Sequence, residues 1–196
     1  MIRSLLIAAS LGVLSVGAVE AAPAYPDKPI TLLIPYPPGG SADMLARPLG
    51  AELQKKWGQP VVLEYKPGAG GAIASAQLAR AKPDGYTLLM VLAAHAINPS
   101  LYPSLPYDTR RDFAPVSLVA TLPMLVAAPL STPASTIPEL IAYGKDHPGK
   151  LSFASAGNGN TSHLAAEMFK NQTGVDMMHV PYKGSCLLYT SDAADD

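Results

Sequence analysis

The sequence contains little cysteine and little charge, and each shortage narrows the possible classes of protein. Cys186 is the single cysteine among 196 residues, which excludes an intramolecular disulfide framework and a metal site built from several thiolates. Charged residues make up 15% of the chain, with 14 Lys and Arg against 15 Asp and Glu. Nucleic acid is therefore disfavoured as a partner, because no basic excess is available to neutralise its phosphates.

The two ends of the chain differ from its middle. Arg3, the apolar stretch 5–16 and small residues up to Ala24 have the order of a secretory signal peptide. The stretch is too short for a membrane anchor, which needs roughly 20 apolar residues. We therefore expect residues 1–24 to direct export and a soluble protein to reach a bacterial periplasm. Residues 186–196 resemble translated read-through of a sequencing adapter, a hypothesis that resequencing the locus would test.

Short apolar runs, glycine-rich loops and amphipathic stretches alternate along the middle of the chain, which predicts an α/β fold with a largely parallel sheet. Strands are predicted over 30–34, 61–65, 87–92, 152–155 and 177–181. Helices are predicted from a cap at residue 41 or 43 to 57, and over 72–81, 137–147 and 161–174. Ser41 or Asp43 can cap the first helix, and Pro48 within it predicts a kink or a break. From residue 97 proline-punctuated strands are expected, including 113–120 and 124–129. The last helix is expected to bury Leu164, Met168 and Phe169.

Three loops share one composition, since each follows a predicted strand, contains glycine and small hydroxyl residues, and leads into a helix. They span residues 37–43, 67–72 and 155–162. Glycine allows a ligand to approach the backbone, and a helix N-terminus offers unpaired N–H groups to an anion. In an open α/β sheet these loops would meet at the carboxyl ends of the strands. Together they predict a binding cleft for carboxylate or phosphate oxygens.

Catalytic, metal and nucleotide sites fit the sequence less well. Gly157 and Gly159 lack the third glycine of a dinucleotide fingerprint, and no Walker motif is present. Ser155, His163 and Asp176 could form a hydrolase triad, but the chain has no Gly-x-Ser-x-Gly elbow. His163 in a first helical turn is better interpreted as a capping or packing residue, and Ser155 as a hydrogen-bond donor to a ligand. The four histidines show no metal-binding spacing.

A series of motifs carries a specific resemblance. The motifs are YPDKPI (25–30), PYPPGGSAD (35–43), KPGAGG (66–71), PDGYT (83–87), LPYD (105–108), DF (112–113), PGK (148–150) and HVPYKG (179–184). In this order and spacing, from Tyr25 to Ser185, they resemble the substrate-binding proteins of tripartite tricarboxylate transporters, the Bug family. The resemblance implies a type II periplasmic binding protein, a monomer of two α/β domains that close about a hinge. It would bind a small carboxylate without cofactor, metal or catalysis and deliver it to membrane transporter subunits.

The resemblance also implies domain limits and site residues. Residues 25–100 would belong to domain one, and 101–185 to the crossover and an incomplete domain two. Ligand carboxylates would be held by backbone N–H groups, small hydroxyls and bridging waters. One wall of the site would consist of Tyr36, Gly39, Gly40, Ser41, Asp43, Gly68, Ala69, Gly70 and Gly71, and the other of Ser155, Ala156, Gly157, Asn158, Thr161, Tyr182, Lys183 and Gly184. Asp43 would either hold a ligand amine or only cap its helix.

Two expectations follow from where the resemblance stops. Members of the family continue beyond the turn at 182–184, so we expect the chain to be a fragment truncated within domain two, with unpaired strand edges and marginal stability. The ligand stays open, because citrate-like acids, dicarboxylates, amino acids and aromatic acids all suit such loops. A soluble sensor for a membrane receptor, which would use the same site, and a secreted hydrolase stay as alternative functions.

Overall fold

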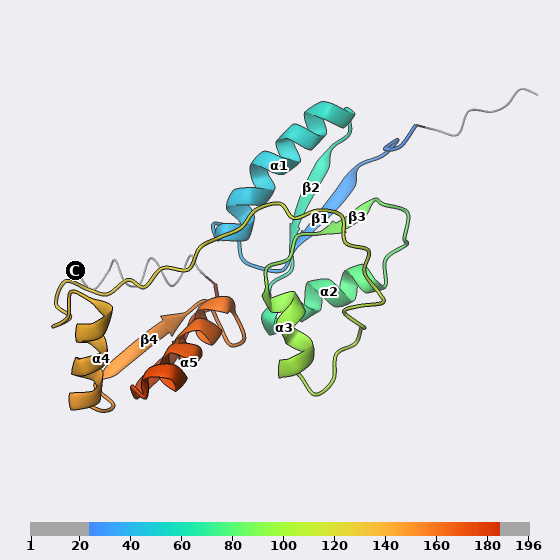
Figure 1. Cartoon of the computed structure of the whole chain (residues 1–196). Helices are drawn as coiled ribbons and strands as arrows, with labels where there is room; N and C mark the ends of the chain where they lie inside the picture. Colours follow the sequence, from blue (N-terminus) through green and yellow to red (C-terminus); the bar gives the residue numbers. More distant parts are fainter. Residues whose placement is uncertain (1–23, 185–196) are drawn as a thin grey trace, which may run out of the picture.

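The computed structural model describes residues 24–184 and contains two α/β units (Figure 1). The N-terminal unit consists of β1 (Ile30–Ile34), α1 (Ser41–Trp57), β2 (Val61–Tyr65), the 3-10 turn η1 (Ala69–Gly71), α2 (Ala72–Ala79), β3 (Thr87–Leu89) and α3 (Ala94–Leu101). The C-terminal unit consists of α4 (Ile137–Asp146), β4 (Leu151–Ser155), α5 (Thr161–Thr173) and β5 (Met177–Pro181). Residues 1–23 of the predicted signal peptide and the tail 186–196 lie outside the described residues. Among residues 24–184, no helix is long and apolar enough to span a membrane.

The N-terminal unit is built on a parallel sheet of order β2-β1-β3. Ile30 pairs with Val61 and Thr31 with Thr87, so β1 is the central strand. A central parallel strand is covered on both faces, which explains why β1 is apolar at every position except Thr31. Ile30 and Ile34 are fully buried there. The predicted α/β class with parallel pairing is confirmed.

Helix α1 follows β1 and runs through Pro48 without a break, so the predicted break is wrong. Pro48 removes one N–H from the helix ladder, but it lies on the exposed face, where water can satisfy the carbonyl left without a donor. The N-cap residue is Gly40, and no side chain caps it. The predicted capping by Ser41 or Asp43 is therefore wrong, since both lie inside the helix.

The region after β2 departs from the prediction in two places. Strand β3 ends at Leu89 and not at 92, because the chain leaves the sheet after the Met90 N–H donates to the Leu33 carbonyl at 3.0 Å. Residues 94–101 then form α3 where proline-punctuated strand was expected. The side chain of Asn98, 1% exposed, donates to the Gly70 carbonyl at 3.1 Å and holds α3 against η1. This long-range contact overrides the local proline signal.

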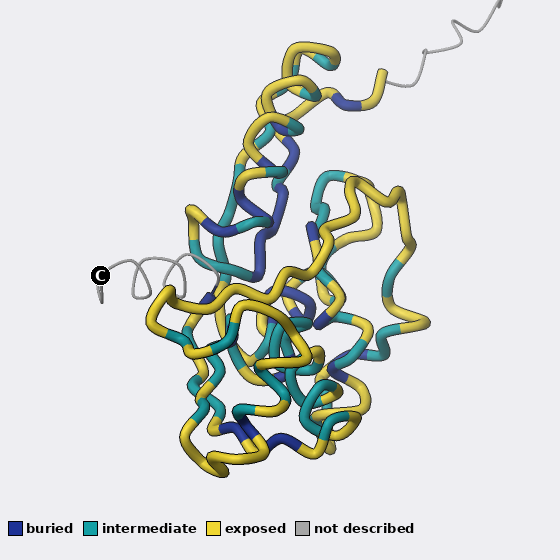
Figure 2. The backbone as a smooth tube through the Cα atoms, turned by 60° about the vertical axis from the view of Figure 1, so that its left-hand side comes forward, coloured by how far each residue is buried: buried dark blue, intermediate teal, exposed yellow. Residues whose placement is uncertain are grey.

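The connection from α3 to α4 contains no strand, so the strands predicted over 113–120 and 124–129 are wrong. Figure 1 shows this connection as a long extended path between the units, and Figure 2 shows it largely exposed. Val116 and Leu125 are both 85% exposed. An extended segment becomes a strand only when a neighbour completes its hydrogen bonds, and no described segment pairs with this one.

The C-terminal unit contains one parallel pair, β4 with β5, in which Leu151 lies opposite Met177. A reciprocal capping box starts α4, because Thr136 accepts from the Glu139 N–H and Glu139 accepts from the Ser135 N–H. Helix α5 buries no residue completely. Met168 is 60% exposed, and Leu164 and Phe169 are only half-buried, so their predicted burial is wrong. A two-stranded sheet covers only one side of a helix.

Candidate functional site

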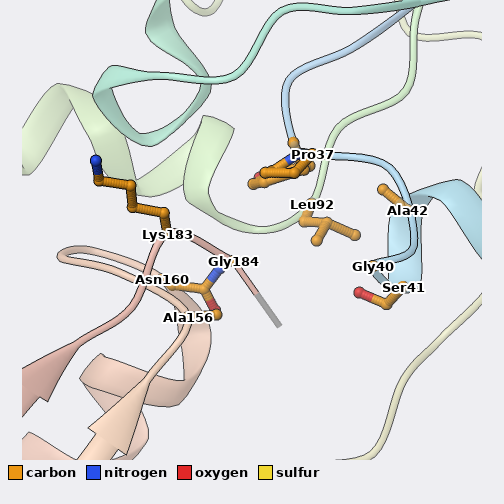
Figure 3. A pocket seen from close by; sticks show the side chains of 10 residues that line it. Pro37, Gly40, Ser41, Ala42, Leu92, Ala156, Asn160, Lys183 and Gly184 are labelled. Atoms are coloured by element: carbon orange, nitrogen blue, oxygen red, sulfur yellow. The ribbon is translucent and has the colours of Figure 1, made fainter. Parts of the chain in front are cut away.

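A small cleft lies between the two units at the carboxyl ends of their strands (Figure 3). The N-terminal unit lines it with Tyr36, Pro37, Gly40, Ser41, Ala42 and Leu92, and the C-terminal unit with Ala156, Asn160, Lys183 and Gly184. Its volume of about 20 Å³ has room for roughly one water molecule. A dicarboxylate is larger than this volume.

The N-terminus of α1 offers hydrogen-bond donors to this cleft. The first bond of the helix runs from the Met44 N–H to the Gly40 carbonyl at 3.0 Å. The N–H groups of the first turn precede this bond and have no carbonyl partner within the helix. Because no side chain caps this end, the backbone of Ser41 and Ala42 can bind an anion, and the dipole of the 17-residue helix favours it.

Tyr36 and Lys183 add polar side chains from opposite units. Burial raises the pKa of Tyr36 to about 12, although a backbone hydrogen bond with Leu92 lowers it. The phenol therefore stays protonated at neutral pH and can donate a hydrogen bond to a carboxylate. Lys183 is exposed and contributes a positive charge to the rim of the cleft. The cleft thus combines neutral donors with one cation, which suits an anionic oxygen group.

Asp43 is buried beside the cleft but does not line it. Its carboxylate accepts hydrogen bonds from the Gly39 N–H at 2.8 Å, from Arg47 Nε at 2.9 Å and from the hydroxyl of Tyr65. Burial raises the pKa of Asp43. The three hydrogen bonds, above all the one from Tyr65, together lower it by more, so the pKa lies below its ordinary value. Asp43 therefore ties the first loop to α1 and β2 as a carboxylate.

The second predicted loop, residues 68–71, lies beside the first loop and outside the lining of the cleft. Gly70 and Gly71 have φ of 59° and 91°, which glycine adopts without strain. A Cβ at residue 71 would lie 3.1 Å from Cβ of Pro35 and 3.9 Å from the hydroxyl of Tyr36. Glycine at this position therefore lets the loop approach the base of the cleft.

The third loop brings Ala156 and Asn160 to the cleft, and the turn after β5 brings Lys183 and Gly184. Ser155 is fully buried beneath this loop, and its carbonyl accepts from the Tyr182 N–H at 2.8 Å. The remaining predicted residues of this unit lie outside the lining: Ser155, Gly157, Asn158, Thr161 and Tyr182. In the first loop, the predicted residues Gly39 and Asp43 also lie outside the lining.

Sequence reasoning missed four lining residues: Pro37, Ala42, Leu92 and Asn160. Asn160 had a readable signal, because Asn directly before a helix is a common N-cap. Its Oδ1 accepts from the Ser162 N–H at 3.2 Å. Leu92 had no such signal, because the apolar run 87–92 predicts a strand through this residue, whereas β3 ends at Leu89.

The hydrolase alternative is not assembled. Ser155 lies 2.6 Å from Nε2 of His179, whereas His163 accepts from the Gly159 N–H at 3.2 Å. His163 therefore caps and packs, as expected from its place in the first turn. A fully buried Ser155 is also inaccessible to a substrate. Among residues 24–184, no group of His, Cys, Asp and Glu is arranged to hold a metal ion.

Residues 45–189 match the model of a family described as tripartite tricarboxylate transporter family receptor. A protein from the tcbD-tcbE intergenic region of a Pseudomonas species is 41% identical over 162 residues, covering 83% of this chain and 48% of the relative. Protein BugT of Bordetella pertussis is 40% identical over 172 residues, covering 87% and 53%. The chain therefore spans about half the length of the curated relatives that it matches.

Solved structures show the same relation. A Rhodopseudomonas palustris protein solved with adipate has a TM-score of 0.78 at 37% identity, covering 82% of this chain and 54% of that chain. MatC of the same organism, solved with bound malate, has a TM-score of 0.77 at 33% identity, covering 85% and 57%. The periplasmic binding protein BugD gives 0.68 at 33% identity, covering 88% and 56%. The fold is that of the periplasmic binding proteins, as the sequence predicted.

Proposed function

Because this chain belongs to the tripartite tricarboxylate transporter receptor family, we propose that it is a periplasmic solute-binding protein that delivers a small carboxylate to membrane transporter subunits. Export through residues 1–24 and a two-domain organisation about a hinge belong to the same proposal. Relatives solved with adipate and with malate support the ligand class. The family name supports the transporter as the partner.

The convergence of donors at the cleft carries this proposal. The backbone of Ser41 and Ala42 and the Tyr36 phenol come from the N-terminal unit, and Lys183 comes from the C-terminal unit. A carboxylate accepts up to four hydrogen bonds, so these groups can share one between the two units. Asp43 and Ser155 do not line the cleft, but their hydrogen bonds hold the first and third loops in place.

Domain closure explains how such a site binds tightly. A cleft of about 20 Å³ has room for little more than one water molecule. Opening along the connection between α3 and α4 would admit the acid, and closure would then bury it between the two sets of donors. Binding energy from both units is thereby combined, while neither unit alone surrounds the ligand.

A thermal-shift screen of small mono-, di- and tricarboxylates against the full chain encoded by the gene tests the proposal. An acid present at about a thousand times its Kd should stabilise the protein by about 4 kcal/mol, a clear rise in Tm. Neutral amides of the same acids serve as matched controls, and no shift is expected with them. A rise in Tm with the amides alone would contradict carboxylate binding. So would a panel in which no acid raises the Tm.

A further inference from the structure

Three aromatic rings stack beneath the third loop of the cleft. The imidazoles of His163 and His179 have centroids 4.2 Å apart at 23°, and the ring of Phe153 stacks on His179 at 4.8 Å and 14°. The rings come from α5, β5 and β4, the elements that carry this loop and the turn after β5. The stack therefore lies at the base of the C-terminal wall of the cleft.

Each imidazole holds one polar group of the loop. Nδ1 of His163 accepts a hydrogen bond from the Gly159 N–H at 3.2 Å. Nε2 of His179 lies 2.6 Å from the hydroxyl oxygen of Ser155. Ala156 and Asn160 are the two loop residues that line the cleft. Ser155 directly precedes Ala156, and Gly159 directly precedes Asn160. The two histidines thus fix both ends of the ligand-facing segment.

The His163 contact requires a neutral ring. Nδ1 of His163 can accept only through its lone pair, so the ring proton resides on Nε2 and protonation at Nδ1 would break the bond. The Ser155 oxygen accepts from the Gly157 N–H at 3.2 Å and is nearer to His179 Nε2 than to the Gly157 carbonyl at 3.3 Å. The hydroxyl can donate to Nε2 or to the Gly157 carbonyl, so this contact forms with either tautomer of His179.

The surroundings disfavour a positive charge on the stack. Burial lowers the pKa of His179, and the charge of a protonated His163 lowers it further. The other charged groups that face the rings are Glu167 and Lys170 of α5, which pair with each other at 3.0 Å and so largely cancel. Protonation of both histidines would place two positive charges on rings whose centroids are 4.2 Å apart.

We propose that His163 and His179 are positioning residues that hold the third loop as a neutral stacked pair, and that protonation of this pair releases the loop and weakens carboxylate binding. The link to affinity rests on the proposed function, whereas the loop contacts stand on the geometry alone. The consequence is tight binding at neutral pH and release of the ligand on acidification.

The first test uses the full chain without ligand. An NMR titration between pH 8 and 4.5 follows both imidazoles and the Gly159 amide. We expect Nδ1 of His163 to be unprotonated at neutral pH, and the Gly159 amide to exchange faster with solvent as the pair protonates. A Gly159 amide that ignores the titration of both rings, or His163 carrying its neutral-ring proton on Nδ1, would overturn the proposal.

The second test compares the pH dependence of binding to malate and adipate in four proteins: wild type, His163→Gln, His179→Gln and the control His147→Gln. His147 lies exposed at the end of α4, and titration of the acid itself is common to all four. Between pH 7.5 and 5.5 we expect about tenfold more loss of affinity in wild type and His147→Gln than in the other two, equivalent to one unit of pKa shift.

Equal pH profiles in all four proteins would overturn the histidine proposal. Absence of binding in every protein at both pH values would instead contradict carboxylate binding, and the Gly159 amide would still decide whether the pair holds the loop.

Discussion

The two units of this protein form one cleft but are stabilised in different ways. The N-terminal unit has a central strand whose Ile30, Leu33 and Ile34 are fully buried. The C-terminal unit has one strand pair, and α5 packed on it buries no residue completely. One wall of the cleft thus stands on an apolar core. The other depends on hydrogen bonds beneath its loop and on contact with the first wall.

The largest expected effect is loss of the N-terminal core. Leu33→Ala removes a fully buried side chain from β1 and should lower the free energy of unfolding by about 2–5 kcal/mol. The control Met168→Ala, on α5 at 60% exposure, should change it by less than about 0.5 kcal/mol. Urea unfolding measures both, and equal costs would contradict the asymmetry between the units.

The next effect concerns Asp43, which joins the first loop to α1 and β2. Asp43→Asn should destabilise the protein by about 2 kcal/mol near neutral pH, because it weakens three hydrogen bonds to a buried carboxylate. The control Asp146→Asn changes an exposed carboxyl at the end of α4 and should have little effect.

The pH dependence of this loss has a definite sign. The pKa of folded Asp43 lies below its unfolded value, so its stabilisation is fully present above that unfolded value, about 3.9, and is lost as pH falls through the folded pKa. The difference between wild type and Asp43→Asn should therefore shrink in acid. A difference that grows below pH 4 in unfolding experiments would contradict this role.

A smaller effect tests contact between the units. Gly159 in the third loop has φ of 75°, and a Cβ there would overlap Cδ1 of Leu101 at the end of α3. Gly159→Ala should displace the Leu101 side chain at the contact between the units and weaken binding of the acid selected by the thermal-shift screen. The matched control Gly174→Ala has φ of 71° with open space around it, so it should lower Tm through the backbone but keep affinity.

A second-site change sharpens this test. Leu101→Ala removes the overlapping side chain, so the double variant with Gly159→Ala should regain most of the lost affinity. Failure of the double variant to recover, with Gly174→Ala unaffected, would show that the loop conformation and not closure limits binding.

The smallest effect belongs to the rim of the cleft. Lys183→Gln removes its exposed cation and should weaken carboxylate binding about threefold to fivefold, since solvent-exposed ion pairs contribute at most about 1 kcal/mol. Lys150→Gln, an exposed cation of the same unit outside the cleft, is the control. Calorimetric titration at low and high salt measures both. Equal losses, or a loss that grows with salt, would contradict a direct charge contact.

Local patterns predicted the parts of the fold that local physics determines. The apolar run 30–34 and the glycine loop 37–43 that follows it indicated β1 and the helix after it correctly. Helix α3 could not be predicted this way, because Pro99 argued against it and the Asn98 contact to Gly70 is long-range. The apolar stretches 113–120 and 124–129 are typical of strands. A strand also needs a neighbouring segment to pair with, and no local pattern reveals that neighbour.

The candidate site was predictable in its chemistry but only partly in its membership. Glycine loops before helices indicated the ranges 37–43 and 155–162, and the resemblance selected Gly40, Ser41 and Ala156 within them, which line the cleft. The same composition could not separate residues that face the cleft from those that support them, such as Asp43 and Ser155. That distinction depends on side-chain partners from β2 and β5, which are distant in the sequence.

The central claim is that a carboxylate binds between the units at the N-terminus of α1. A crystal structure of the full chain with the acid selected by the thermal-shift screen tests it most directly. We predict a carboxylate oxygen within hydrogen-bond distance of the Ser41 or Ala42 N–H, with the Tyr36 hydroxyl and Lys183 close by. An acid bound outside this cleft, or one whose carboxylate contacts only one unit, would contradict the account.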